Sequence, residues 1–373
     1  ARPMGSPQIL DLETLLAPID GDNPAGVDLR EDSSPTSEYY QVKDARSAAR
    51  AAERSLEADD EPGALPDEWR TILKMAPDLI ATKSKDLELA SWLIEALLRA
   101  NGFAGLRDGF KLAKGLIEQF WDGLYPLEDE DGIETKVGPL SGLNGEGADG
   151  TLIQPIRKVP ITDGSSYGPY AAWHFDQASE LSKIADEEKR QARIDAGVVP
   201  MDDFERSVAE SSSGYYQSLI ADLEECLEAY AELGAALDEK AGHDAPPTSN
   251  IRNTLSTVLD TVKFVSRDLI AVSEEGQADE AGGEAGAGAA AGGAAPAAAS
   301  GPVVSREDAF KQLLRVADYF RKAEPHSPIS YTLEELVRRG RMSLPDLLAE
   351  LIVDDSTRQD FLARAGIRLP EAE

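Results

Sequence analysis

Three short segments of the chain combine residue types and spacings that could support chemistry. Residues 164–168 read GSSYG and match the G-x-S-x-G elbow, in which Ser166 would be the nucleophile of a hydrolase. Residues 145–150 read GEGADG and match G-x-G-x-x-G, a loop whose backbone N–H groups can hold a dinucleotide pyrophosphate. Residues 128–132 read EDEDG, and carboxylates are ligands that Ca²⁺ prefers. Each chemistry also requires a particular structural context.

The context around Ser166 does not suit a hydrolase. A nucleophile elbow is a strained turn between a strand and a helix, followed along the chain by an acid and a histidine. Residues 156–162 are the only segment with a strand-like pattern, and a proline within it weakens that prediction. His174 is too close to Ser166 in sequence to be the usual partner, and His243 and His326 lie in other regions. We therefore interpret GSSYG as a loop and keep a Ser166 hydrolase as the alternative function.

The other two segments fail similar requirements. A dinucleotide loop follows a strand, but residues 140–144 have no strand pattern, and Glu146 and Asp149 would repel a pyrophosphate. A twelve-residue calcium loop with its glycine at the sixth position would begin at Leu127 and end at Gly138, and neither residue supplies a side-chain ligand. We interpret both segments as loops and expect no catalytic residue, cofactor or metal site.

The composition excludes several classes of function. The 373 residues include 69 Asp and Glu against 37 Lys and Arg, which gives a net charge of −32. This charge argues against binding to nucleic acid or to an anionic membrane surface, since both require clustered basic residues. The single cysteine, Cys226, cannot form an internal disulfide, and no run of about 18 apolar residues could span a bilayer. We expect a cytoplasmic protein without a nucleic-acid partner and without membrane insertion.

Low sequence complexity marks one domain boundary. Residues 274–302 contain no large apolar side chain, and these 29 residues predict a flexible Ala/Gly-rich linker. Its root-mean-square span as a random coil would be roughly 30 Å. Residues 303–373 carry 11 basic and 13 acidic side chains, so this piece is nearly neutral and residues 1–302 have a net charge of −30. Copies of the C-terminal piece could therefore pack together while the acidic parts repel one another.

Apolar residues at helical spacing dominate the chain before this linker. Residues 86–100 are apolar on most sides, so they predict a core helix, and Gly102 follows as its C-terminal cap. A narrow polar stripe interrupts this helix, formed by Glu88, Ser91, Glu95 and Arg99.

The remaining pattern predicts an all-α, multidomain protein built from helical bundles. Residues 121–168 are rich in Gly and Pro and predict irregular structure, whereas residues 176–196 predict one polar surface helix. Apolar seams over 204–237 and 251–272 predict two antiparallel packed helices, with coiled coils as the alternative. The predicted domains are an N-terminal helical domain at 1–168, a middle helical bundle at 169–273, the linker at 274–302 and a C-terminal oligomerisation domain at 303–373.

The C-terminal piece predicts four short helices that are too small to form an extensive core of their own, so oligomerisation would stabilise them. Residues 319–328 read YFRKAEPHSP, and the two prolines force an extended corner between the first two helices. This corner is interpreted as a subunit contact or as a rigid turn, and the two interpretations are compatible. The candidate oligomerisation residues are Phe310, Leu314, Tyr319, Phe320, Glu324, Pro325, His326 and Pro328.

Several segments, taken in order, resemble a known family. They are PID at 18–20, PAGVDLR at 24–30, EWR at 68–70, KSKDLELASWL at 83–93, ALLR at 96–99, GFAGL at 102–106 and FWDGLYP at 120–126. Together they make residues 9–160 similar to the ImpA N-terminal domain of the type VI secretion system TssA family. Beyond the linker, YFR at 319–321, EPHSP at 324–328 and SY at 330–331 resemble the C-terminal domain of the short TssA branch.

This resemblance implies a structural role. TssA proteins are non-enzymatic scaffolds that assemble into rings through the C-terminal domain and contact baseplate, inner-tube and sheath components. They prime or guide polymerisation of the contractile tail, either at the baseplate or at its distal end. We therefore expect a homo-oligomeric ring at the secretion machine, while a free adaptor or chaperone would share the same chemistry. Residues 170–272 resemble nothing that would distinguish these roles.

Overall fold

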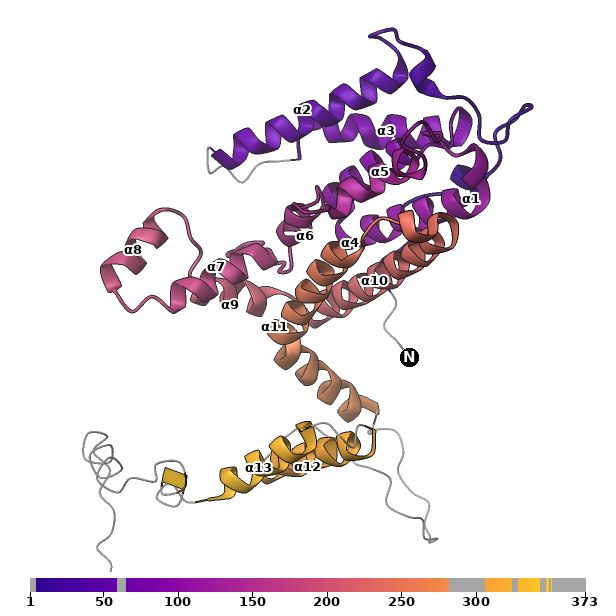
Figure 1. Ribbon diagram of the computed structural model, residues 1–373. Helices are drawn as coiled ribbons and strands as arrows, with labels where there is room; N and C mark the ends of the chain where they lie inside the picture. The colour runs from indigo at the N-terminus through magenta and orange to yellow at the C-terminus, as the bar shows by residue number, and fades with distance from the viewer. Residues whose placement is uncertain are drawn as a thin grey trace, which may run out of the picture. The chain divides into compact units, whose positions relative to one another are not determined.

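A computed structural model describes residues 5–58, 65–281, 306–323 and 328–342, together with residues 347, 348 and 350. These residues form helices and isolated β-bridges, and no β-strand occurs among them (Figure 1). The chain divides into two compact units, Ala1–Gly286 and Ala287–Glu373. The all-α prediction is therefore confirmed.

The first unit contains eleven of the labelled α-helices in its described residues. They are α1 (Leu12–Leu16), α2 (Glu38–Ala58), α3 (Asp67–Thr82), α4 (Leu87–Phe120), α5 (Ile133–Asn144), α6 (Ile153–Lys158), α7 (Ala172–Ser182), α8 (Glu187–Asp195), α9 (Met201–Glu210), α10 (Ser213–Ala241) and α11 (Ser249–Ala281). Short 3-10 helices occur at Leu29–Glu31, Trp121–Gly123 and Gly242–Asp244.

Helix α4 is the centre of the first unit. It begins at Leu87 because the Asp86 carboxylate accepts hydrogen bonds from the free amides of its first turn. Gly102 has a φ of 58° and breaks the helix into two segments, as predicted, although the chain continues as helix to Phe120. Apolar side chains cover nearly all sides of both segments, and a helix of this kind is stable only when other helices surround it.

One hydrophobic cluster extends through the first unit, from Leu10 to Val262. Helix α10 packs along α4, and α11 returns along α10 after a loop that contains two prolines, as the predicted antiparallel pair requires (Figure 1). The predicted division at residue 168 lies within this shared cluster. Whether the parts on either side fold independently stays a prediction.

Two helices lie where the sequence predicted other structure. Residues 121–168 are not irregular throughout, because α5 forms despite Pro139 and buries three apolar side chains against the core. The strand predicted at 156–162 is wrong, since α6 occupies Ile153–Lys158 and buries Ile153 and Ile156 one turn apart. Tertiary burial of these isoleucines therefore decides the local structure, and only a single β-bridge links Pro160 to Ala171.

The surface helix predicted at 176–196 is two helices, α7 and α8. The Asp186 carboxylate accepts a hydrogen bond from Lys189 N–H and caps α8, so the chain turns before it. Helix α11 continues to Ala281, which places the first eight residues of the predicted linker in a helix. Helix-forming Glu, Gln and Ala residues favour this extension. Residues 282–302 lie outside the described part of the chain.

The second unit contains α12 (Arg306–Ala323) and α13 (Ile329–Arg341), which pack against each other as a hairpin. Ala317 and Val337 are buried and form the centre of this contact. Helix α13 ends at Arg341, one residue after Gly340. Residues 347, 348 and 350 are helical, and the fourth predicted helix lies outside the described residues.

Candidate functional site

Three segments that are far apart in sequence join at the N-terminus of α4. Val27 N–H donates to the Lys83 carbonyl at 3.0 Å, and Lys85 N–H donates to the Ala25 carbonyl at 2.8 Å. Tyr125 N–H in turn donates to the Lys85 carbonyl at 2.9 Å. We call this junction of residues 23–30, 83–87 and 124–126 the signature knot, because it contains residues on which the sequence resemblance rests.

An ion pair holds the signature knot together. The Arg30 guanidinium donates to both Asp86 carboxylate oxygens, at 2.8 and 3.2 Å, and also donates to Asp28 at 2.9 Å. Burial alone would lower the pKa of Arg30, but the hydrogen bonds and charge of Asp86 outweigh it and raise this pKa. Asp86 also caps α4, so the side chain couples the knot to the central helix. The hydrogen bonds of its carboxylate among the described residues all go to Arg30 or to the first turn of α4.

Two further residues allow the knot to close. Gly26 has a φ of 78°, and a Cβ atom there would lie 2.0 Å from the Lys83 carbonyl oxygen. Lys85 is fully buried and donates to the carbonyls of Leu15 and Ile80, both at 2.8 Å. These carbonyls belong to the last turns of α1 and α3, where intrahelical donors are missing. The ammonium group therefore joins two helix ends to the knot.

The polar stripe predicted on α4 faces α2. Trp69 of α3 adds a third element, since its Nε1–H donates to Glu53 at 2.8 Å. Each long side chain of the stripe therefore has a defined partner on α2. The pairs of this polar seam are Tyr39 with Glu88, Arg46 with Glu95, and Glu53 with Arg99.

A second buried charge network attaches the N-terminal segment to α4 and α10. The Arg107 guanidinium contacts Asp108 at 2.8 Å and Glu225 at 2.7 Å, and it donates to the Ser6 carbonyl at 2.9 Å. Ser6 N–H and Oγ–H both donate to Asp222 at 2.6 Å. Burial would lower the pKa of Arg107, but its carboxylate partners raise it. This network holds the N-terminal segment against α4 and α10.

The structure does not provide Ser166 with the partners of a nucleophile. The Ser166 amide donates to the Glu210 carboxylate at 2.8 Å, which pins the loop to the end of α9. His174 Nδ1 accepts a hydrogen bond from Ala171 N–H at 2.9 Å, so the imidazole caps α7. Burial first, and then the charge of Lys158, lowers the pKa of His174. No hydrogen bond joins Ser166 to a histidine within the described residues.

The other two sequence motifs also form local turns. Gly145 ends α5 with a φ of 82°, and a Cβ atom there would lie 2.1 Å from the Ala148 carbonyl oxygen. Asp129 Oδ1 accepts from Thr135 Oγ and Asp131 N–H, and these bonds lower its pKa. Among the described residues, no group of three His, Cys, Asp or Glu side chains is arranged to hold a metal ion.

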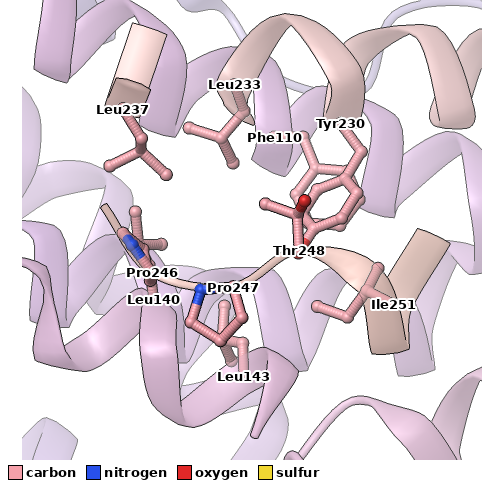
Figure 2. Close-up of a pocket in the computed structure, with 10 residues that line it drawn as sticks. All are labelled: Phe110, Leu140, Leu143, Tyr230, Leu233, Leu237, Pro246, Pro247, Thr248 and Ile251. Carbon is pink, nitrogen blue, oxygen red and sulfur yellow. The ribbon is translucent and has the colours of Figure 1, made fainter. Parts of the chain in front are cut away.

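One small cavity lies between α4, α5, α10 and the start of α11. Its volume is about 10 Å³, which is enough for about one water molecule, and its walls are almost entirely apolar. Figure 2 shows Phe110 and Tyr230 on one side and Pro247 below them. A water molecule needs several polar partners, so we interpret this space as a packing gap.

The α12–α13 hairpin carries the predicted oligomerisation residues that the structure describes. Phe310 packs on Gly340, where a Cβ atom would lie 2.7 Å from the Phe310 ring. Tyr319 is 66% exposed and stacks edge-on with Phe320, while Pro328 precedes α13. Leu314 is partly buried in the hairpin, and Glu324, Pro325 and His326 lie outside the described residues. The candidate contact role of all these residues stays a prediction.

Comparison with known proteins gives three similarities. A family model described as ImpA, N-terminal, type VI secretion system, matches residues 16–145, a range that contains the whole signature knot. The type VI secretion system component TssA1 of Pseudomonas aeruginosa is 27% identical over 366 residues, which cover 98% of this chain and 100% of that protein. The solved N-terminal domain of the TssA component from Burkholderia cenocepacia, which includes the conserved ImpA_N region, matches with a TM-score of 0.60 and 28% identity. This match covers 72% of the present chain and 98% of the solved one.

No helix in the described part of the chain is both long and apolar enough to cross a membrane.

Proposed function

The chain belongs to the TssA family of type VI secretion system components, and from this premise we propose that it is a non-enzymatic scaffold that assembles into a ring. Residues 303–373 would form the ring, and the acidic N-terminal unit would contact baseplate, inner-tube or sheath proteins to prime or guide tail assembly. The protein would act on the cytoplasmic side of the machine. The relatives are components of such a system by name, and the ring and its partners are our proposal.

The observation that carries the proposal is a concentration of exposed apolar side chains on the α12–α13 hairpin. Five of the nine exposed large hydrophobic residues in the described chain lie on this hairpin. Such a concentration on a short segment is typical of a protein–protein contact. Tyr319 and Tyr331 are the most exposed members, at 66% and 62%, and aromatic residues dominate the energy of many interfaces. The five residues are Val316, Tyr319, Ile329, Tyr331 and Leu336.

A ring would also explain the uneven charge of the chain. Residues 1–302 have a net charge of −30, so unbound N-terminal units would repel one another around a nearly neutral ring. Once one unit had bound its partner, each neighbouring unit would bind at an effective concentration of about millimolar. Weak individual contacts would then organise a large assembly.

The test is the native mass of the full chain, measured by multi-angle light scattering. We expect a large homo-oligomer that dissociates when Tyr319→Ser and Tyr331→Ser are combined. The matched control combines Val27→Ser and Leu127→Ser, which removes exposed apolar residues from the first unit and should leave the mass unchanged. A wild-type monomer at micromolar concentration would refute the ring. An unchanged mass of the tyrosine double variant would show that another surface forms the contact.

A further inference from the structure

Helix α2 presents a row of arginines in a strongly acidic chain. Arg46, Arg50 and Arg54 lie four residues apart, so they follow one side of the helix at a rise of about 6 Å per step. Arg99 of α4 lies beside them, since its charge acts on Arg50 together with those of Arg46 and Arg54. We call these four residues the arginine cluster.

The two carboxylates next to the arginine cluster are already occupied. Glu95 is fully buried and accepts from Arg46 Nε at 2.6 Å and from Arg46 Nη2 at 3.2 Å. Glu53 accepts from Arg99 Nη2 at 3.0 Å and from Trp69 Nε1 at 2.8 Å. Four guanidinium groups therefore share the two carboxylates whose positions the structure gives beside them.

Arg50 and Arg54 are the members for which the described part of the chain supplies no partner. Neither forms a hydrogen bond or ion pair with any residue that the structure describes. Arg50 is nevertheless half-buried, and burial lowers its pKa; the charge of Glu95 opposes this shift, whereas repulsion by Arg46, Arg54 and Arg99 adds to it. Arg30 and Arg107 show the opposite shift, because carboxylates surround them. A partly desolvated guanidinium without an acceptor is unfavourable, and an incoming anion would relieve this situation.

We propose that Arg50 and Arg54 form a docking site for an acidic segment of a protein partner, with one carboxylate on each guanidinium. The spacing of about 6 Å matches acidic residues four apart on a helix or two apart on a strand. Ser47 and Ala51 lie exposed on the same helix, and their small side chains leave room for the partner. A long nucleic acid fits less well, because the surrounding acidic surface would repel a polyanion. Only the class of partner, a protein, rests on the proposed function.

The probe is fluorescein-labelled hexaglutamate, titrated with the full chain at low salt and followed by fluorescence anisotropy. We expect binding that weakens with added salt and at least tenfold when Arg50→Gln and Arg54→Gln are combined. The charge-matched control combines Arg193→Gln and Arg252→Gln, two exposed arginines elsewhere in the first unit, and should change the affinity less than twofold. Urea unfolding should show that both double variants remain folded, because none of the four side chains forms an ion pair with a residue that the structure describes.

Several outcomes would overturn the proposal. Absence of hexaglutamate binding at millimolar concentration would do so, as would equal weakening in both double variants, which would indicate a general charge effect. Binding that appears only after Asp59, Asp60 and Glu61 are neutralised would show that these acidic residues of the same chain are the partners of the arginines. Tighter binding of a labelled oligothymidylate with the same arginine dependence would assign the cluster to nucleic acid. Ring formation does not enter this test, so failure here would leave the scaffold proposal intact.

Discussion

Replacing Lys85 with methionine tests whether the signature knot depends on one buried ammonium group. Methionine has a similar length, but it cannot donate to the Leu15 and Ile80 carbonyls, which Lys85 Nζ contacts at 2.8 Å each. A buried carbonyl that loses its donor costs about 1–3 kcal/mol. Removing the buried charge offsets part of this loss. We expect the free energy of unfolding, measured in urea at pH 7, to fall by about 3 kcal/mol.

The same substitution should show a defined pH dependence. Burial lowers the pKa of Lys85 from 10.5 to about 8. Between these values the unfolded chain binds one more proton than the folded chain, so wild-type stability rises with pH in this window. The neutral amine keeps two N–H donors, one for each carbonyl. Since the methionine variant has no group to titrate, its deficit should widen above pH 8, by at most about 1.4 kcal/mol per pH unit.

Lys74→Met provides the control, because Lys74 is exposed on α3 and its removal should change neither stability nor its pH dependence. A constant deficit of the Lys85 variant from pH 7 to 9.5 would mean that Lys85 stays charged in the folded chain. The dipoles at the ends of α1 and α3 would then favour the charged form of Lys85 more strongly than burial disfavours it. A fully stable variant would contradict the assigned role of Lys85 altogether.

Three further predictions use the same structure. Gly26→Ala should lower the free energy of unfolding by at least about 2 kcal/mol, whereas Gly142→Ala, at an open helical position, should raise it by about 0.5–1 kcal/mol; equal effects in urea would refute this account of the knot. Arg107→Gln should destabilise the chain by about 3–5 kcal/mol and speed amide exchange in the N-terminal segment, and protected amides there would argue against this attachment. Ser166→Ala and His174→Ala should each leave secretion unchanged at normal protein abundance; loss of secretion with normal abundance and normal oligomeric mass would revive the hydrolase hypothesis.

The central helix could be predicted because its sequence is sufficient to define it. Residues 86–100 are apolar on most sides, Asp86 is a strong N-terminal cap, and Gly102 permits the positive φ at the break. The polar stripe was also visible in the sequence. Its partners on α2 were not, because a pairing between residues 46 and 95 depends on the tertiary arrangement and not on local periodicity.

The signature knot shows what sequence patterns leave out. Its three segments were recognised separately, but nothing in a single sequence indicates that Ala25, Lys85 and Tyr125 share hydrogen bonds. The incorrect strand at 156–162 has a related cause, since a short β-branched run fits either a strand or one buried helical turn. Burial within the surrounding core selected the helix. The oligomerisation residues could be proposed only from the exposed hairpin and the resemblance, and they stay predictions.

The polar seam also fixes where α2 can settle on α4 during folding. Along both helices the bridges run in the same order, from Tyr39 and Glu88 through Arg46 and Glu95 to Glu53 and Arg99. The sign of the charges reverses at the last bridge. If α2 slid by two turns in one direction, Glu53 would face Glu95, and in the other direction Arg46 would approach Arg99. Like charges at close range are unfavourable in a partly buried site. An apolar seam would tolerate such sliding, whereas this one permits a single alignment, so the buried ion pairs specify position even where they add little net stability.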